Sequence, residues 1–339
     1  PFKIYSVSVV AFAMGLGLVL EAPTWKRAGL LAWMVGTGYF IVGWSWLVQP
    51  FLVDIRAHGW MAPFAVVLLS AAMSSYWGVA AALAHAVRPR LRWIALPFAL
   101  GLAEYVRGWA FTGFSWGGPG LIWIETPVAQ LAAWIGAYGL GWVTLLFASG
   151  IYVAIYGRWR MATLLASGVV LAGLGFLADQ RPLPERADAP VVRLIQPNAP
   201  QHLKWDQDWV MTWFERGVAL TAAEPEGPEP DLVVWPESSI PTLQGQAPAL
   251  EAQAYEAAQP AQLIAGIQRR VGATYRNSIV AYAGPAEPAW VYDKHHLVPF
   301  GEFVPFGDLL AKVGIRGLAQ QEGYGFSEGT GPEMHQLSG

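Results

Sequence analysis

Residues 28–53 read AGLLAWMVGTGYFIVGWSWLVQPFLV, a run without a single charged side chain. A helix needs about 20 mostly apolar residues to cross the hydrocarbon core of a bilayer, so this run is long enough to span. The same criterion predicts six spans, near residues 4–20, 28–53, 60–87, 93–106, 127–156 and 161–178. Residues 1–180 are therefore predicted to form a multi-span α-helical membrane domain.

The composition supports a membrane protein with a polar C-terminal part. Hydrophobic residues make up 54 % and charged residues 13 %, against about 45–50 % and about 25 % in soluble proteins. Asp, Glu, Gln and Pro become frequent only after the last apolar run. Prolines mark residues 181–190 as a linker, and residues 191–339 as a soluble domain. The net charge of -3 gives no reason to expect nucleic acid as a partner.

Basic residues fall in alternate loops between the predicted spans. Lys and Arg in short loops stay in the cytoplasm, so this alternation places residues 191–339 on the opposite side of the membrane. Aromatic residues near the span ends are predicted to form interfacial belts. The basic loops contain Lys26, Arg27, Arg88, Arg90, Arg92, Arg158 and Arg160, and the predicted belts contain Trp25, Trp44, Trp46, Trp60, Tyr76, Trp77, Trp109, Trp116, Trp123, Tyr156 and Trp159.

Two features of the membrane part allow more than one interpretation. Glu104 and Arg107, at the end of the fourth span, are interpreted as an interfacial anchor pair, with the lining of a polar cavity as the alternative. The Gly- and aromatic-rich residues 104–126 form either a rim for a lipid substrate or a plain interfacial loop.

The polar part alternates short apolar runs with helix-like stretches, which favours an α/β layered fold. We predict strands at 191–196, 231–235, 263–267, 278–283 and 289–292, and helices at 206–222 and 249–258. Two of these strands end at charged residues, Glu237 and Lys294. Residues just past strand ends are where α/β folds place ligands.

A carboxylate and an ammonium at such a site suit acyl transfer. Glu237 could act as a general base, and Lys294 could stabilise an oxyanion on an acyl carbon. The thiol that such a base normally activates is missing, because the sequence contains no cysteine. Ser238 and Ser239 follow the base too closely to be its nucleophile. His295 and His296 have no acidic partner at ligand spacing, so we interpret them as structural and predict no metal site.

Two motifs carry a resemblance to a known family. LVVWPESSIP at 232–241 and YDKHHLVPFGEFVP at 292–305 resemble the signatures of the apolipoprotein N-acyltransferases, the membrane-bound branch of the nitrilase (carbon–nitrogen hydrolase) superfamily. Residues 104–116, 196–205 and 275–278 are also similar to that family. The resemblance implies that residues 191–339 are part of a nitrilase-like αββα sandwich.

The resemblance also implies roles for individual residues. Glu237 matches the family's general base, Lys294 the lysine that stabilises the tetrahedral intermediate, and Glu302 a further carboxylate of the site. Trp205 matches an aromatic residue on an arm over the active site, and is expected to contact substrate. The family's catalytic cysteine lies on a strand beyond the matched region, so we expect a chain incomplete at both ends and inactive by itself.

The implied reaction moves an acyl chain from a membrane phospholipid to the α-amine of the N-terminal cysteine of a diacylglyceryl-modified bacterial lipoprotein. It passes through a thioester and needs no cofactor. The implied location is the bacterial inner membrane, with the soluble domain in the periplasm. Two alternatives stay open: a tethered amidase or nitrilase that hydrolyses small amides, and a membrane protein with a non-catalytic binding domain.

Overall fold

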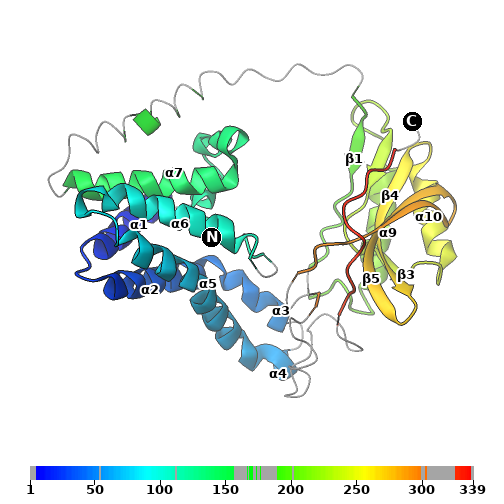
Figure 1. Cartoon of the computed structure of the whole chain (residues 1–339). Coiled ribbons are helices and arrows are strands. Elements are labelled where there is room, and N and C mark those ends of the chain that lie inside the picture. Colours follow the sequence, from blue (N-terminus) through cyan, green and yellow to red (C-terminus); the bar gives the residue numbers. More distant parts are fainter. Residues whose placement is uncertain are drawn as a thin grey trace. The chain divides into compact units, whose positions relative to one another are not determined.

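The computed structural model describes residues 5–52, 55–110, 113–155, 166, 168–170, 173, 176, 189–200, 202–298, 302–303 and 325–336. The chain divides into two compact units, Pro1–Leu183 and Pro184–Gly339. The first is helical and the second is built around a β-sheet (Figure 1). The division falls within residues 181–190, the segment that the prolines mark in the sequence.

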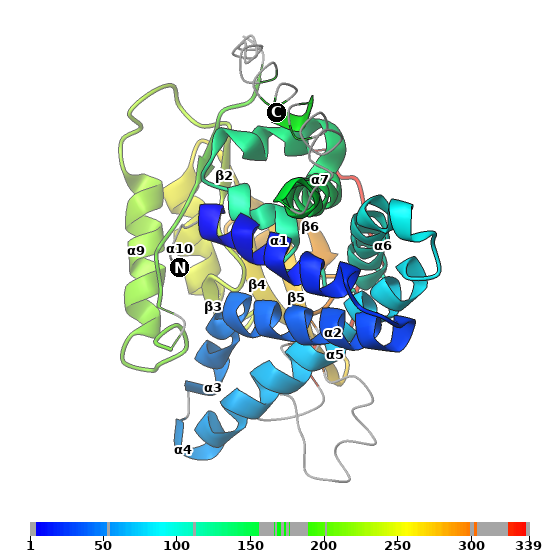
Figure 2. The ribbon, with the colours of Figure 1, turned by 90° about the vertical axis from the view of Figure 1, so that its left-hand side faces the viewer.

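Five longer helices of the first unit pack in a closed ring, each against the next (Figure 2). The ring runs α1, α2, α5, α6, α7 and back to α1. The bounds are α1 Tyr5–Leu20, α2 Trp25–Gly43, α5 Ala62–Ala84, α6 Arg92–Arg107 and α7 Ala132–Ile155. Shorter pieces connect them: η1 Ser45–Val48, α3 Gln49–Leu52, α4 Ile55–His58, η2 Gly59–Met61, η3 Pro89–Leu91, η4 Pro119–Trp123 and η5 Pro127–Leu131.

Helices α2 and α5 approach closely where two glycines face each other. A Cβ added to Gly29 would lie 3.0 Å from the carbonyl oxygen of Gly78, and one added to Gly78 would lie 3.2 Å from that of Gly29. Larger side chains would push the two backbones apart. The glycines therefore allow the close helix packing that small residues give in membrane helices.

Only part of the predicted span pattern reappears as long single helices. Among the residues that the structure describes, two helical stretches are long and apolar enough to cross a membrane, Gly59–Ala84 and Pro127–Ile155, and the bent pair Trp25–Gly43 with Ser45–Leu52 could be a third. The pair bends by 63°, so the apolar run at 28–53 is broken between its two helical parts, and its crossing of the membrane stays a prediction. The runs at 4–20 and 93–106 form helices of 16 residues each. The span predicted over 161–178 falls mostly outside the described residues.

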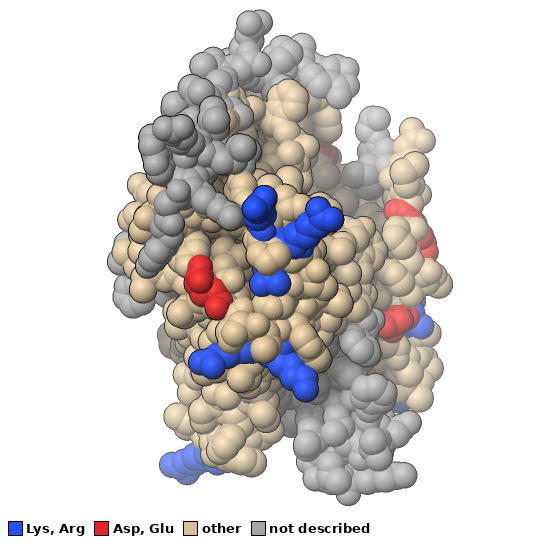
Figure 3. Space-filling model, turned by 60° about the vertical axis from the view of Figure 1, so that its left-hand side comes forward, with Lys and Arg blue, Asp and Glu red and all other residues tan. Residues whose placement is uncertain are grey.

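The outer surface of the helical unit is apolar, as in a membrane protein. Large hydrophobic side chains that are more than half exposed lie on α1, α5 and α6, among them Met14, Leu68, Leu83 and Phe98. Figure 3 shows a face dominated by uncharged residues, with Lys and Arg in a few small groups. Proteins in water rarely expose an apolar surface of this extent. The acyl chains of a lipid bilayer would cover it.

The aromatic-belt prediction is wrong for Trp44 and Trp77. Both side chains are buried, with 1 % and 2 % of their surface exposed. Trp44 stacks on Phe40 with ring centroids 4.2 Å apart, and Trp77 donates a hydrogen bond to Glu104 at 2.8 Å. Span-end position alone does not separate an interfacial tryptophan from one that turns inward to a polar partner.

Glu104 and Arg107 form a buried ion pair inside the helical unit. Their side chains are 4 % and 0 % exposed and are joined at 2.6 Å. Arg107 also donates to the carbonyl oxygens of Phe114 and Trp116, which fastens the following loop to the end of α6. This burial contradicts the anchor-pair interpretation. A lipid-binding role for residues 104–126 stays a prediction.

The second unit contains a mixed six-stranded sheet in the order β1-β2-β4-β5-β6, with β3 pairing to β4 off this path. Strands β1, β2, β3 and β4 run parallel, and β5 is antiparallel to both β4 and β6. The bounds are β1 Val192–Leu194, β2 Leu232–Val234, β3 Ile240–Leu243, β4 Gln262–Val271, β5 Thr274–Gly284 and β6 Glu287–Asp293. Two helices accompany the sheet, α9 Val210–Ala222 and α10 Pro248–Ala258.

The predicted strands and helices of this unit are confirmed in type, with shifted ends. The strand β3 was missed because its sequence, Ile-Pro-Thr-Leu, contains Pro241, which cannot donate to a ladder. Within the described part of the chain β3 pairs only with β4, so the missing N–H of the proline faces no second strand there.

The two faces of the sheet differ. One face packs against α9 and α10, with Phe214, Leu263 and Ile267 almost fully buried in the shared core. On the other face, the register aligns Leu194, Val234, Ile264, Ala281 and Trp290 across five strands. Leu194 at the edge of that row is 75 % exposed. The described residues thus form a helix layer and a sheet layer.

Candidate active site

The predicted catalytic residues meet at one edge of the sheet. Strands β2, β4 and β6 run in the same direction, so their carboxyl ends share an edge. Glu237 follows the end of β2 and Lys294 follows the end of β6. The amino-terminal part of the antiparallel β5, which carries Asn277, reaches the same edge. The sheet therefore delivers charged side chains that are distant in the sequence to one place.

A glycine in β4 makes room for the turn that carries Glu237. A Cβ added to Gly266 would lie 2.7 Å from Glu237 Cα and 2.7 Å from the backbone nitrogen of Ser238, closer than real contacts allow. The turn is fixed to β4 by the backbone N–H of Ser239, which donates to Gly266 O at 2.9 Å. The base candidate is therefore held at the backbone, while 59 % of its side chain is exposed.

Lys294 lies between two carboxylates. Its Nζ is 2.8 Å from Glu302 Oε1 and 3.7 Å from Glu237 Oε2. Glu302 is 9 % exposed, and its other oxygen accepts the backbone N–H of Val298 at 2.7 Å. Glu302 is thus ordered from both sides, whereas the Glu237 side chain is 59 % exposed and its Oε2 has only the longer contact with Lys294. An ammonium has three donor hydrogens, and only the Glu302 contact is at hydrogen-bond distance. Even if the Glu237 contact shortened, one hydrogen would stay available for a further acceptor.

Asn277 links the two carboxylates. Its Nδ2 donates to Glu237 Oε1 at 2.7 Å and to Glu302 Oε1 at 2.9 Å. The backbone carbonyl oxygen of Asn277 accepts the backbone N–H of Lys294 at 2.8 Å. Reasoning from the sequence noted residues 275–278 as family-like but did not single out this buried amide. Its role depends on contacts between residues far apart in the chain.

Trp205 lies beside the cluster rather than within it. Trp205 is 48 % exposed, and Lys204 Nζ lies 5.7 Å from the centroid of its ring. Lys204 in turn donates to the carbonyl oxygen of Glu237 at 3.0 Å. Burial lowers the pKa of Lys204, and the Glu237 carboxylate opposes that shift. Sequence reasoning missed Lys204, which connects the Trp205 segment to the base candidate.

The serine and histidine alternatives gain no support from the geometry. Ser238 is buried next to Glu237, and the Ser239 hydroxyl donates to Gly266 O at 3.2 Å. His295 and His296 are both exposed. Within the described ranges, no three His, Asp or Glu side chains gather as metal ligands.

This arrangement suits proton abstraction next to a fixed positive charge. A substrate thiol or amine could reach the exposed Glu237 carboxylate, and the remaining hydrogen of Lys294 could stabilise negative charge on an acyl oxygen. Glu302 and Asn277 order these two groups. The cluster has a base and an electrophilic partner, and the sequence supplies no cysteine for it.

Comparison with known proteins identifies the family. Residues 1–150 match the model of the apolipoprotein N-acyltransferase N-terminal domain. Proteins named apolipoprotein N-acyltransferase are 39 % identical in Caulobacter vibrioides, 34 % in Allorhizobium ampelinum and 32 % in Sinorhizobium fredii. The matches cover 90 %, 93 % and 100 % of this chain and 61 %, 63 % and 68 % of those proteins, respectively.

The matched region consists of a helical unit with the apolar surface of a membrane protein and a mixed α/β unit. The α/β unit contains the Glu–Lys–Glu cluster. The chain belongs to the apolipoprotein N-acyltransferase family. It spans about three fifths of the length of the Caulobacter and Allorhizobium relatives.

Proposed function

We propose that the full-length protein carrying residues 1–339 is an acyltransferase that modifies bacterial lipoproteins. The acyl donor is a phospholipid, and the acceptor is the α-amine of the N-terminal cysteine of a diacylated lipoprotein. The observation that carries this proposal is the meeting of Glu237, Lys294 and Glu302 at one sheet edge, in a chain of this family.

In the proposed reaction, Glu237 takes a proton from a cysteine thiol that these 339 residues do not contain. The thiolate attacks the acyl carbonyl of the phospholipid, and Lys294 stabilises the oxyanion. Protonated Glu237 returns that proton to the departing glycerol oxygen, so lysophospholipid leaves as an alcohol and a thioester remains. The amine of the lipoprotein then attacks the thioester, its proton passes to the regenerated Glu237 carboxylate and on to the departing sulfur, and an amide and the free thiol are formed.

A membrane location follows from the substrates. Both are lipid-anchored, so a protein with apolar outer helices meets them in two dimensions, which lowers the entropic cost of encounter. We propose the inner membrane, with Pro184–Gly339 on the periplasmic side, as the loop charges predict. We propose Trp205 as a substrate contact, because it stands exposed beside the base candidate.

We also propose that the second unit belongs to a nitrilase-like αββα sandwich. One face of its sheet is covered by helices, whereas the other presents an aligned apolar row that includes Leu194 and Trp290. A second sheet packed on that row would give the sandwich. The expected incompleteness of the chain stays a prediction.

The test is a reconstituted acylation assay with the full-length protein. The protein is incubated with phospholipid vesicles and a synthetic diacylated lipopeptide. The mass of the lipopeptide is then measured by mass spectrometry. The expected result is the addition of one acyl chain, with lysophospholipid released in equal amount. A lipopeptide whose α-amine is acetylated is the matched control and should stay unchanged.

Other outcomes would support the alternatives. Release of free fatty acid without acylation, or hydrolysis of small amides, would identify a hydrolase with water as the acceptor. No reaction with any acyl donor would favour a non-catalytic membrane protein.

A further inference from the structure

Residues 325–329, Gly-Phe-Ser-Glu-Gly, run directly against the backbone of two of the proposed active-site residues; we call this segment the strap. The backbone N–H of Phe326 donates to Glu302 O at 2.7 Å, and that of Gly329 donates to Lys294 O at 2.9 Å. The strap therefore holds the main chain at both residues whose side chains form the 2.8 Å ion pair.

The strap takes the place that β6 leaves free beside β5. Strand β6 ends at Asp293, opposite Ser278, so the first residues of β5 lack a neighbour from β6. Phe326 pairs there with Tyr275, and the backbone N–H of Ser327 donates to Tyr275 O at 2.9 Å. Backbone N–H and C=O groups that are shielded from water need hydrogen-bond partners. The strap supplies these partners to the first residues of β5.

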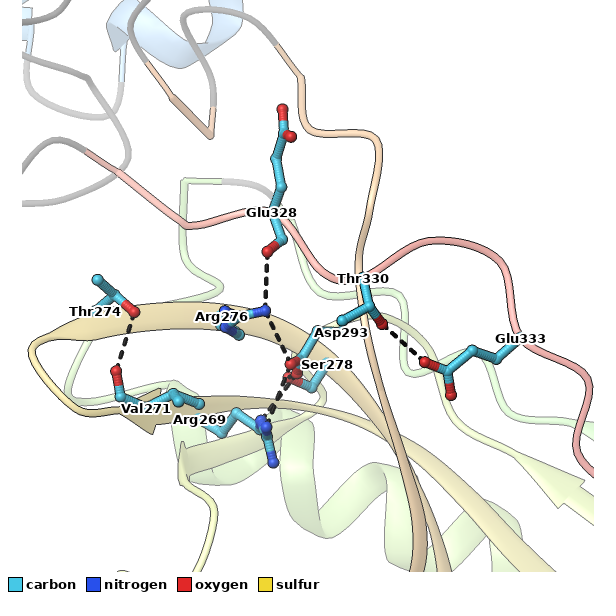
Figure 4. Close-up of polar contacts among 9 residues, drawn as sticks. All are labelled: Arg269, Val271, Thr274, Arg276, Ser278, Asp293, Glu328, Thr330 and Glu333. Carbon is cyan, nitrogen blue, oxygen red and sulfur yellow. Dashed lines mark hydrogen bonds and ion pairs between the residues drawn. The ribbon is translucent and has the colours of Figure 1, made fainter.

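Arg276 fastens the strap to the end of β6. Its guanidinium donates to Glu328 O at 2.8 Å and to Asp293 Oδ2 at 3.2 Å (Figure 4). Asp293, the residue before Lys294, also accepts from Ser278 at 2.7 Å and forms an ion pair with Arg269 at 2.8 Å. The main chain that enters Lys294 is thus fixed by a network that includes the strap.

Both ends of the strap are glycines because the backbones are too close for a side chain. A Cβ on Gly329 would overlap Asp293 O and lie 2.8 Å from its carbonyl carbon. A Cβ on Gly325 would overlap Glu302 O, and its φ of +102° is one that other residues rarely adopt. The obstructing atoms belong to the main chain, so they cannot rotate away.

We propose that the strap is a positioning element that sets the distance between Lys294, Glu302 and the reacting acyl group, with Gly329 and Arg276 as positioning residues. The proposal rests on the proposed function. Displacing a catalytic group by about 1 Å can cost about 10²-fold in rate. The strap's hydrogen bonds go to the backbone of Lys294, Glu302 and Tyr275 and to Arg276, so we expect substrate affinity to change little.

The first test is Gly329→Ala in the full-length protein, assayed with phospholipid vesicles and the diacylated lipopeptide. We expect kcat to fall about 10- to 100-fold, with KM for both substrates within about twofold. The matched control is Thr330→Ala, just outside the strap, whose hydroxyl donates only outward to Glu333. It should retain the wild-type kcat.

The second test uses Arg276, in case Gly329→Ala fails to fold. Arg276→Lys keeps a donor for Glu328 O and Asp293, whereas Arg276→Met keeps none. We expect Arg276→Lys to restore most of the kcat that Arg276→Met loses, at equal KM. Equal kcat for the two variants, or a loss in KM alone, would overturn the proposal.

A third measurement separates this proposal from the proposed function. Hydrogen exchange of the full-length protein reports the Lys294 amide, which donates to Asn277 O, whether or not any acylation is observed. We expect Gly329→Ala to speed exchange at Lys294, and Thr330→Ala to leave it unchanged. Unchanged exchange in Gly329→Ala would refute the strap even if the wild type acylates. If the wild-type protein does not acylate the lipopeptide, the proposed function is refuted. The exchange rate at Lys294 still tests the strap in that case.

Discussion

Each unit of the chain contains a cluster of acidic and basic side chains, and the two clusters are built in opposite ways. Glu104 and Arg107 are sealed in the helical unit at 4 % and 0 % side-chain exposure. Trp77 and two backbone carbonyls complete their hydrogen bonds. In the sheet unit, the Glu237 side chain is 59 % exposed, and from the residues that the structure describes only its Oε1 accepts a short hydrogen bond.

The difference separates a structural charge pair from the cluster that we propose to be reactive. A buried pair with every group satisfied gains nothing from meeting a ligand, and losing one partner leaves an uncompensated charge. A cluster that orders one carboxylate and leaves the other accessible can exchange a proton with a substrate. Stability should therefore depend on the first cluster, and activity on the second.

The largest expected effect is on activity, from Glu237→Gln. The amide keeps the shape and cannot take a proton, so kcat for lipopeptide acylation should fall by about 10²–10⁴-fold. Because the side chain is exposed, the unfolding temperature should stay near the wild-type value. The matched control is Glu256→Gln, an exposed carboxylate on α10, which should have full activity. Undiminished turnover in the Glu237 variant would eliminate it as the base.

The next effect is on stability, from Arg107→Met. This change leaves Glu104 buried without its partner and should destabilise the helical unit by about 3–5 kcal/mol. Thermal unfolding of the protein in detergent measures it, with the exposed Arg90→Met as the control. The double variant Glu104→Gln/Arg107→Met should unfold at a higher temperature than the single one. If Arg107→Met is as stable as Arg90→Met, the Glu104–Arg107 pair does not stabilise the fold, and the proposed difference between the two clusters is wrong.

A smaller effect on activity is expected from Asn277→Leu. The substitution removes the donor shared by both carboxylates, and hydrogen bonds to charged groups contribute about 1.5–3 kcal/mol. We expect kcat to drop about 10- to 100-fold, since about 1.4 kcal/mol equals a factor of ten. Ser239→Ala, which loses a nearby hydroxyl that contacts neither carboxylate, should keep its kcat. If the two variants have the same kcat, Asn277 does not order the carboxylates for catalysis and has only a packing role.

The smallest effect is expected from His295→Ala/His296→Ala. Both imidazoles are exposed, so neither acylation nor its pH dependence should change by more than about twofold. Acylation should also be the same with and without a chelator. A large loss of acylation in the double variant or with the chelator would support a metal-binding or base role for His295 and His296.

Much of the site could be predicted because motifs are local. The runs that end at Glu237 and Lys294 indicate strands followed by charged residues, and the sheet confirms both placements. The prediction was incomplete for Asn277 and Lys204, since nothing in their own sequence neighbourhood shows which distant side chains they meet. It was wrong for Glu104, Arg107, Trp44 and Trp77, because a helix sequence does not show which face turns inward in a bundle.

The sequence by itself determined the division into an apolar helical part and a polar α/β part. It also paired Glu237 with Lys294 as candidate site residues, to which the family resemblance added Glu302. Hydrophobic run length and strand periodicity are properties of neighbouring residues, so they can be read along the chain. Only the tertiary structure decided which charges are buried and which are open. It also decided that a strap of five residues holds Lys294 and Glu302, because burial and long-range backbone contacts exist only once the chain has folded.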